Sequence, residues 1–338
     1  MGEFLADSRK VNGKRVRTLG TRGSKEAGGT LDARLSAQLR ATRSVEPLRP
    51  AIGPLRVATL WTPGADAVLF HGDCEELLQS MPDESVQLIV SSPPYNIGKS
   101  YEKKSPLSTY IEWQKRVLRE CERVLAPGGS VCWQVGNYVD KKTGEVIPLD
   151  ALFWPVLHDL GLLSRNRIVW TFDHGLHATR RFSGRHESVL WFSKGPDAYF
   201  NVDPIRVEQK YPNKRYFKGP KKGELSCNPN GKNPGDVWNI PNVKHNHPEK
   251  TEHPCSFPIE LAERFVLSMS RPGDVVVDPF GGVGSTVVAA ALHGRVGVMA
   301  EMDEKYVKVA EERLTKATNG VLLARPMGKP IYGTEAPR

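Results

Sequence analysis

The stretch VQLIVSSPPYN, residues 86–96, runs from an apolar segment directly into two prolines and an aromatic ring. Residues 86–91 have the β-branched and apolar composition of a buried strand. Proline lacks a backbone N–H and fixes φ, so Pro93 and Pro94 cannot extend a hydrogen-bonded ladder. The sequence therefore predicts a rigid corner at the end of a strand, shaped either to hold a ligand or simply to lead into a helix.

Strands and helices alternate on both sides of this corner. A helix is expected to begin at Ser105-Pro106, because proline suits a first turn, and to end before Pro127-Gly128-Gly129. The other strands are expected at 67–70, 130–135, 167–171, 186–193, 274–278 and 296–300, and the other helices at 74–81, 149–160, 258–269, 283–293 and 303–316. This alternation predicts an α/β fold with a doubly wound, mostly parallel sheet and a large insertion.

A glycine-rich loop, DPFGGVGST at residues 278–286, follows another predicted strand. Gly281, Gly282 and Gly284 permit tight turns and let a ligand approach the backbone closely. The loop is not a dinucleotide fingerprint, because Val287 stands where the third Gly or Ala should be. It is not a phosphate-binding P-loop either, because no Lys precedes Ser285.

Glu301 ends the next predicted strand, where an acidic residue commonly binds ribose hydroxyls. With the glycine loop, it predicts a nucleoside-bearing cofactor that carries little phosphate; the alternative is a plain tight turn between a strand and a helix. Ligands of doubly wound sheets bind beyond the carboxyl ends of the strands. The proline corner and the glycine loop are therefore expected to be neighbours, although about 185 residues separate them.

The side chains of the corner can receive an amino group attached to a flat ring. The Pro93 carbonyl lies outside any regular ladder and can accept a hydrogen bond, and the Ser92 hydroxyl can donate or accept one. Tyr95 supplies a flat face on which a base can stack. These three groups together favour a planar ligand with an exocyclic amine.

The net charge of +9 is concentrated in two segments. Residues 1–60 contain 12 Lys/Arg and five Asp/Glu, and residues 174–250 contain 14 and seven, whereas the rest of the chain is acidic. Two basic segments around an acidic body are typical of a nucleic-acid-binding protein with a separate catalytic core. A basic tail and a solvated basic loop without a nucleic-acid partner are the alternative.

The five cysteines are scattered and form no C-x-x-C pair, which favours a reduced, cytoplasmic protein over a disulfide framework or a zinc site. No apolar run is long enough for a membrane span, and the N-terminal residues do not resemble a signal peptide. His174-x-x-His177 and His245-x-His247 lack further ligands nearby in the sequence, so no metal site is predicted.

Ser92-Pro93-Pro94-Tyr95 and the DPFGGVG segment at 278–284 together resemble the two signature motifs of the amino-group DNA methyltransferases, which use S-adenosylmethionine. The resemblance covers about residues 66–316 and includes the segments 72–96, 253–266 and 301–314. The proline tetrad precedes the cofactor loop, as in the circularly permuted β class of these enzymes. The resemblance implies a Rossmann-like methyltransferase fold and transfer of a methyl group to a base flipped out of DNA.

The resemblance also divides the chain into segments. Residues 1–60, rich in Arg, Gly, Ser and Thr, are expected to form a basic, disordered arm. Residues 61–173 correspond to the catalytic half of the methyltransferase domain, and residues 251–318 to its cofactor-binding half. Residues 174–250 between them correspond to the target-recognition region, and residues 319–338 form a tail.

The matched motifs imply the site residues. The resemblance implies catalytic roles for Ser92, Pro93, Pro94 and Tyr95. The implied cofactor-binding residues are Asp73, Phe257, Asp278, Pro279, Phe280, Gly281, Gly282, Gly284, Ser285, Thr286 and Glu301. The basic residues that are candidates for contact with DNA are Arg180, Arg181, Arg185, Lys214, Arg215, Lys218, Lys221 and Lys222.

A serine at the first tetrad position, here Ser92, is associated in this family with the N4 amine of cytosine, and Asp or Asn with the N6 amine of adenine. The resemblance therefore implies N4 methylation of cytosine in double-stranded DNA, with N6 methylation of adenine as the main alternative. An RNA or protein-amide methyltransferase and an inactive DNA-binding relative are more distant alternatives. A homodimer and a companion restriction endonuclease are further implied partners.

Overall fold

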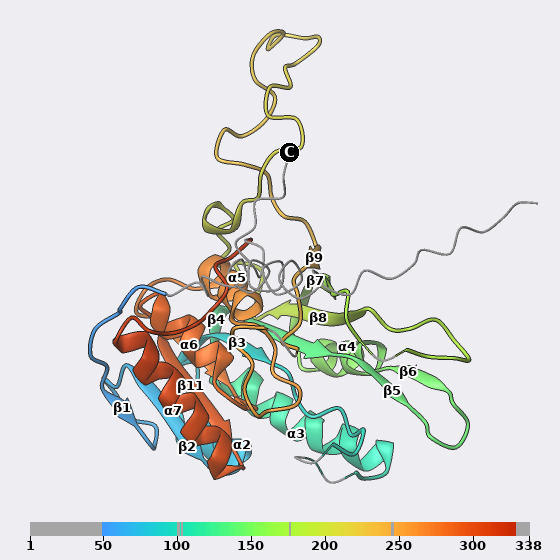
Figure 1. Ribbon diagram of the computed structural model, residues 1–338, viewed down its shortest axis with the longest axis vertical. Helices are drawn as coiled ribbons and strands as arrows, with labels where there is room; N and C mark the ends of the chain where they lie inside the picture. Colours follow the sequence, from blue (N-terminus) through green and yellow to red (C-terminus); the bar gives the residue numbers. More distant parts are fainter. Residues whose placement is uncertain (1–48, 100–101, 103, 176, 245–246, 329–338) are drawn as a thin grey trace, which may run out of the picture. The chain divides into compact units, whose positions relative to one another are not determined.

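The computed structural model describes residues 49–99, 102, 104–175, 177–244 and 247–328. Within them, nine strands form one sheet in the order β1-β2-β11-β10-β3-β4-β8-β7-β9 (Figure 1). These strands are β1 (Val57–Ala58), β2 (Ala67–His71), β3 (Val86–Ser91), β4 (Leu125–Val135), β7 (Leu163–Thr171), β8 (His186–Ser193), β9 (Val237–Asn239), β10 (Val275–Asp278) and β11 (Val296–Glu301).

Strands β1 to β4, β10 and β11 pair in parallel, whereas β8 runs antiparallel to both β4 and β7. The predicted α/β fold with a mostly parallel sheet is confirmed. Ser91 pairs with Trp133 in β4, and Val277 pairs with Ile89 in β3. This register brings the residues that follow β3 and β10 to the same edge of the sheet, as expected.

Helices cover both faces of the sheet because its central strands are apolar on both sides. In β3, Leu88 and Val90 belong to one buried cluster, and Val86 and Ile89 belong to the other. The first cluster packs under α5 (Ile259–Met269), α6 (Ser285–Leu292) and α7 (Glu304–Thr318). The second packs under α2 (Cys74–Ser80), α3 (Leu107–Val124) and α4 (Leu149–Asp159).

Several short elements were not predicted. β4 begins at Leu125 rather than at 130, because Leu125 pairs with Val86 of β3 and the Gly128 N–H donates to the Lys194 carbonyl at 2.7 Å. The hairpin of β5 (Asn137–Val139) and β6 (Val146–Pro148), the edge strands β1 and β9, and the 3₁₀ turn η1 (Asp203–Ile205) also went unforeseen. Each has two or three residues, too few to produce a hydrophobic period.

Residues 49–60 were assigned to the basic arm, but they contain β1 and Arg49, which forms a part-buried ion pair. Residues 1–48 of that arm and residues 329–338 of the tail lie outside the described residues. The predicted insertion at 174–250 contains β8, which is an interior strand of the sheet, and η1 and β9.

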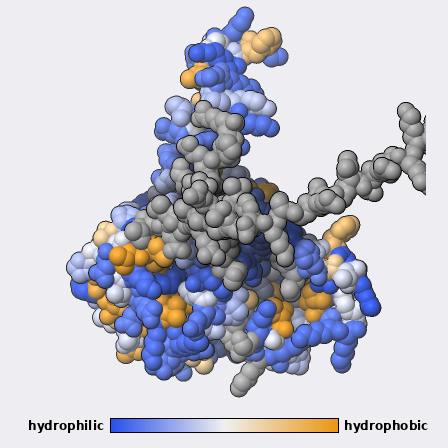
Figure 2. All heavy atoms as spheres, viewed as in Figure 1, coloured by the Kyte–Doolittle hydropathy of each residue, from blue (hydrophilic) through white to orange (hydrophobic). Residues whose placement is uncertain are grey.

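A long loop joins η1 to β9. Figure 1 shows this loop leaving the sheet and returning to it, and isolated bridges pair Val207 with Lys232 and Arg215 with Leu225. Figure 2 shows hydrophilic residues over most of its visible surface, although one aromatic side chain of this loop, Phe217, is 90% exposed. Within the described residues, no helix has the length and apolar content needed to cross a bilayer.

The Arg49 ion pair joins the segment before β1 to the helical layer. Its guanidinium donates to both carboxylate oxygens of Glu263, at 3.0 and 2.9 Å, and to the Arg325 carbonyl at 2.8 Å. The His293 ring nitrogen lies 2.7 Å from the same carboxylate. Burial acts to raise the pKa of Glu263, but the hydrogen bond with His293 and the charge of Arg49 outweigh it and lower that pKa.

Replacing Glu263 with Ala should lower the free energy of unfolding by about 2 to 3 kcal/mol, because the largely buried Arg49 side chain, which is 13% exposed, would lose its counter-charge. Since the pKa of Glu263 is lowered on folding, this stabilisation is present at neutral pH and is lost as the pH falls through the folded value. Urea unfolding as a function of pH measures both effects. The matched control is Glu312→Ala, which removes an exposed pair with Lys316 and should change stability little. Equal losses in the two variants would contradict the prediction.

Candidate functional site

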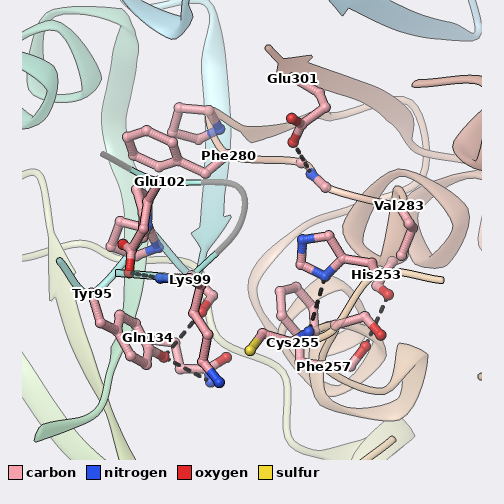
Figure 3. Close-up of a pocket in the computed structure, with 18 of the residues that line it drawn as sticks. Tyr95, Lys99, Glu102, Gln134, His253, Cys255, Phe257, Phe280, Val283 and Glu301 are labelled. Atoms are coloured by element: carbon pink, nitrogen blue, oxygen red, sulfur yellow. Dashed lines mark hydrogen bonds between the residues drawn. The ribbon is translucent and has the colours of Figure 1, made fainter. Parts of the chain in front are cut away.

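A cavity of about 670 Å³ lies where the carboxyl ends of β3, β10 and β11 meet. Its lining comes from the proline corner, the glycine loop, the start of α2, the segment 253–257 and the ends of β4 and β8. Figure 3 shows Tyr95 and Gln134 on one side of the pocket, and His253 and Glu301 on the other. The two motifs that the sequence singles out therefore share one pocket.

Asp278 ties the two motifs together from below. Its carboxylate accepts hydrogen bonds from the Ser91 hydroxyl at 2.6 Å, the Thr286 hydroxyl at 2.8 Å and the Phe280 backbone N–H at 3.1 Å. The side chain is fully buried, and this burial raises the pKa of Asp278 to about 6. One carboxylate thus fixes the end of β3, the glycine loop and the start of α6.

The proline corner is held by a second set of hydrogen bonds. Asn96 adopts a positive φ of 57°, and the Glu102 carboxylate accepts from its N–H at 2.8 Å and from the N–H of Ile97 at 2.7 Å. The Tyr110 hydroxyl donates to the Pro94 carbonyl at 2.7 Å. Pro93 itself lines the pocket.

The Tyr95 hydroxyl lies in a polar network rather than in open solvent. It donates to Oε2 of Glu187 at 3.0 Å and lies 3.0 Å from the Ser92 hydroxyl. The side-chain amide of Gln134 donates to the same carboxylate oxygen and to the Tyr95 hydroxyl. Burial and the nearby Glu187 charge raise the pKa of Tyr95 well above its usual value, so Tyr95 acts as a neutral phenol.

The glycine loop is fixed against β11 and α7. A Cβ on Gly281 would lie 2.5 Å from the Met299 side chain, so the loop can pack this closely only with glycine there. The Glu301 carboxylate accepts from the Gly282 N–H at 3.0 Å and from the Asp303 N–H at 2.9 Å. Its pKa is raised by burial.

The other edge of the loop is joined to the segment before α5. The Ser285 hydroxyl donates to the Phe257 carbonyl at 2.9 Å, and the buried Arg313 guanidinium donates to the Val283 carbonyl at 2.6 Å. Phe280 packs edge-on against Trp113 and Trp133, with ring centroids 5.5 and 6.0 Å apart. The loop therefore presents backbone groups and one aromatic ring to the pocket from a rigid base.

The charges of the lining limit which ligand fits. Four carboxylates line the pocket against two lysines, Lys99 and Lys244. Burial lowers the pKa of His253, another lining residue, to about 4, so its ring is neutral at pH 7. This lining disfavours phosphate groups and favours a ligand with a positive charge and sugar hydroxyls. A nucleoside sulfonium such as S-adenosylmethionine has these properties and fits the residues present.

The structure brings most of the predicted residues into the pocket. The whole tetrad, Ser92–Tyr95, lines it, as do Asp73, Phe257, Pro279, Phe280, Gly281, Gly282, Ser285 and Glu301. Asp278, Gly284 and Thr286 do not line it. They lie beneath the loop: Asp278 and Thr286 are fully buried, and a Cβ on Gly284 would lie 2.8 Å from the Ala310 Cβ.

The basic residues predicted to contact DNA fall into two places. Arg180, Arg181 and Arg185 lie in the loop between β7 and β8, which emerges beside the pocket next to His186 and Glu187. The remaining five, Lys214, Arg215, Lys218, Lys221 and Lys222, are exposed on the long loop before β9. His245, whose pairing with His247 was set aside as a metal site, lies outside the described residues.

Several lining residues were missed. Gln134 and Glu187 belong to β4 and β8, which were predicted as strands but were given no part in the site. His253 lies in a segment whose resemblance to the family was noted, but only Phe257 was selected from it. Both residues could have been found from the sequence, because each is a polar residue at the end of an otherwise apolar strand.

A family model described as DNA methylase matches residues 86–312. The chain is 50% identical over 247 residues to the type II methyltransferase M.BglII of Bacillus subtilis, covering 73% of this chain and 68% of that protein. It is 34% identical over 256 residues to the DNA adenine methyltransferase YhdJ of Escherichia coli strain K12, covering 74% and 83%.

Solved structures show the same fold. The PvuII DNA methyltransferase, described as cytosine-N4-specific, aligns with a TM-score of 0.58 and 22% identity over 81% of this chain and 96% of that one. A DNA modification methylase of Thermus thermophilus, solved with S-adenosyl-L-methionine, aligns with a TM-score of 0.54 and 29% identity over 77% and 98%.

The raised pKa of Asp278 has a measurable effect on stability. A carboxyl group titrates near 3.9 in an unfolded chain, so between about pH 4 and 6 the folded protein binds a proton that the unfolded chain does not. Stability from this group therefore falls as the pH rises through that window, by at most about 3 kcal/mol. Asp278→Asn removes the titration, so its stability relative to the wild type should improve from pH 4 to pH 7.

Chemical unfolding at a series of pH values measures this difference. Asp197→Asn is the matched control, because it makes the same substitution at an exposed aspartate outside the pocket. If the difference between Asp278→Asn and the wild type stays constant over the window, Asp278 does not titrate with a raised pKa.

Proposed function

The chain belongs to the DNA methylase family, and we propose that it transfers a methyl group from S-adenosylmethionine to the N4 amine of cytosine in duplex DNA. At the coarser level it is a site-specific type II DNA amino-methyltransferase, and its cofactor is S-adenosylmethionine. The observation that supports the proposal best is the shared pocket, in which Asp278 joins the Ser-Pro-Pro-Tyr corner to the glycine loop.

We assign the cofactor to the glycine-loop side of the pocket. Asp73 and Glu301 supply carboxylate oxygens for its hydroxyl and amino groups, and Phe280 supplies an apolar wall. Pro279–Gly282, Phe257 and Ser285 line the same side. Asp278, Gly284 and Thr286 shape the loop from beneath without lining the pocket. When bound, the cofactor supplies a methyl group made electrophilic by the sulfonium.

We assign the target base to the corner. A base in duplex DNA is accessible to the pocket only after it is flipped out of the stack. The ring of Tyr95 provides a stacking surface, and the Ser92 hydroxyl and the Pro93 carbonyl accept hydrogen bonds from the exocyclic amine. Two acceptors out of the ring plane draw the nitrogen towards a tetrahedral geometry and free its lone pair for attack. Positioning and electrostatics therefore account for the rate enhancement.

Cytosine is proposed over adenine because the tetrad begins with Ser92. Adenine N6 is the alternative, and the 34% identity to a DNA adenine methyltransferase favours it. Both amines are attached to a planar ring, and the same two acceptors would serve either. The proposed partners are duplex DNA, bound through the basic residues of both loops, a second copy of the chain and a companion restriction endonuclease.

The nucleoside product tests the base. The protein is incubated with S-adenosylmethionine and unmethylated genomic DNA, and the digested nucleosides are identified by mass spectrometry. N4-methylcytosine is expected. Ser92→Ala should lower the product by about tenfold or more, with cofactor affinity unchanged, because it removes one of the two acceptors. N6-methyladenine would overturn the choice of base, and unchanged turnover of Ser92→Ala would overturn the role of the hydroxyl.

The long loop before β9 should contribute to DNA affinity through its charge. The triple variant Lys218→Ala, Lys221→Ala, Lys222→Ala should bind duplex DNA more weakly, and the slope of log affinity against log salt should fall by up to about 0.9 for each phosphate that is no longer neutralised. Binding titrations over a range of salt concentrations measure this. Lys316→Ala, on α7, is the control for charge alone. An unchanged salt slope in the triple variant would exclude phosphate contact by these lysines.

A further inference from the structure

The Glu187 carboxylate lies directly beside the proposed catalytic corner, and the mechanism above does not use it. It is the second residue of β8, and the antiparallel pairing of Val135 with Ser188 brings it to the corner. Its Oε2 accepts from the Tyr95 hydroxyl at 3.0 Å and from the Gln134 amide. Burying a carboxylate on an otherwise apolar strand costs free energy, so the position of Glu187 indicates a function for this side chain.

The hydrogen bonds around Tyr95 have one consistent direction. A carboxylate oxygen can only accept, so the Tyr95 proton goes to Glu187. The Gln134 amide can only donate to the Tyr95 oxygen. The Ser92 and Tyr95 hydroxyls lie 3.0 Å apart, and with the Tyr95 proton already placed, the proton between them must come from Ser92. Both lone pairs of the Ser92 oxygen then remain free to accept.

We propose that Glu187 is a positioning residue that, through Tyr95, keeps the Ser92 hydroxyl oriented as an acceptor for the target amine. The inference rests on the proposed function, because it specifies how the corner receives an amino group. Without the carboxylate, the Tyr95 hydroxyl would be free to donate to the Ser92 oxygen instead. That bond would take one of the two lone pairs and would turn the Ser92 proton away from Tyr95, so the hydroxyl would no longer be held as an acceptor. Glu187 acts through Tyr95 and does not itself contact the base.

The charge of Glu187 strengthens this orientation and should make it depend on pH. Burial raises the pKa of Glu187, and the hydrogen bonds from Gln134 and Tyr95 and the charges of Lys244 and His186 oppose that rise. The carboxylate is the form that holds the Tyr95 proton most strongly. The methylation rate should therefore increase with pH through the titration of Glu187, giving an acid limb in the profile.

Single-turnover methylation at saturating DNA and cofactor tests the proposal. Glu187→Ala should slow the step by about tenfold or more, and Tyr95→Phe, which keeps the ring, should slow it similarly. The double variant should be no slower than Tyr95→Phe alone, because both changes break the same chain. Glu187→Gln should be faster than Glu187→Ala, because an amide oxygen still accepts. Its acid limb should differ from that of the wild type by the part that Glu187 contributes, because an amide does not titrate.

Two further variants serve as controls for the loss of a charge and for the source of the acid limb. Glu311→Gln removes an exposed carboxylate on α7 outside the pocket and should leave rate and profile unchanged. His186→Gln should keep the acid limb, which excludes His186 as its source. Cofactor binding and thermal unfolding are measured for each variant to test whether it folds. If Glu187→Ala does not fold, the pH profiles of Glu187→Gln and Tyr95→Phe test the role of Glu187 instead.

Three results would overturn the proposal: an unchanged rate in Glu187→Ala, additive losses in the double variant, or an acid limb in Glu187→Gln that is identical to that of the wild type. Additive losses would mean that Glu187 acts independently of Tyr95. Failure of the wild type to methylate any base would overturn the proposed function together with this inference. An active wild type with unaffected Glu187 variants would overturn this inference alone.

Discussion

The buried carboxylate of Asp278 is the constraint on which the pocket depends. It ends β10 and accepts three hydrogen bonds, from the last residue of β3, from the glycine loop and from the first turn of α6. Removing a charge from water is costly unless donors surround it, and here each donor belongs to a segment that must be positioned. The energy that compensates for the burial of Asp278 therefore also aligns the corner with the loop.

This constraint acts in space and does not depend on chain order. The segment that carries the corner precedes the segment that carries the glycine loop by most of the length of the domain, yet β3 and β10 are adjacent strands. The intervening chain supplies β4, β7, β8 and β9 on one side of β3. Because β8 runs antiparallel, its first residues emerge at the same edge, so the loop with Arg180 and Arg181 begins next to the pocket.

The sequence predicts those parts of the site that have a local signature. Prolines after a strand and glycines before a helix mark the two loops, and the parallel connection rule places both at one edge. Gln134 and Glu187 could not be placed in this way, because each is a single polar residue whose partner is set by the β4–β8 register. Asp278 was predicted to contact the cofactor, because a motif shows that a residue is present but not where its side chain points. In the structure, the side chain of Asp278 points to Ser91 and Thr286.

The acidity of the pocket has a consequence for the chemistry proposed. Transfer of a methyl group from a sulfonium to an amine moves one positive charge from the cofactor to the base. Asp73 and Glu301 lie on the side assigned to the cofactor, and Glu187 lies behind the corner assigned to the base. Carboxylates therefore lie on both sides of the path along which the methyl group moves. The electrostatic potential stays favourable to a positive charge on the cofactor before the transfer and on the base after it. The same side chains are fixed by backbone and hydroxyl donors before any ligand arrives, so little reorganisation is needed when the charge moves.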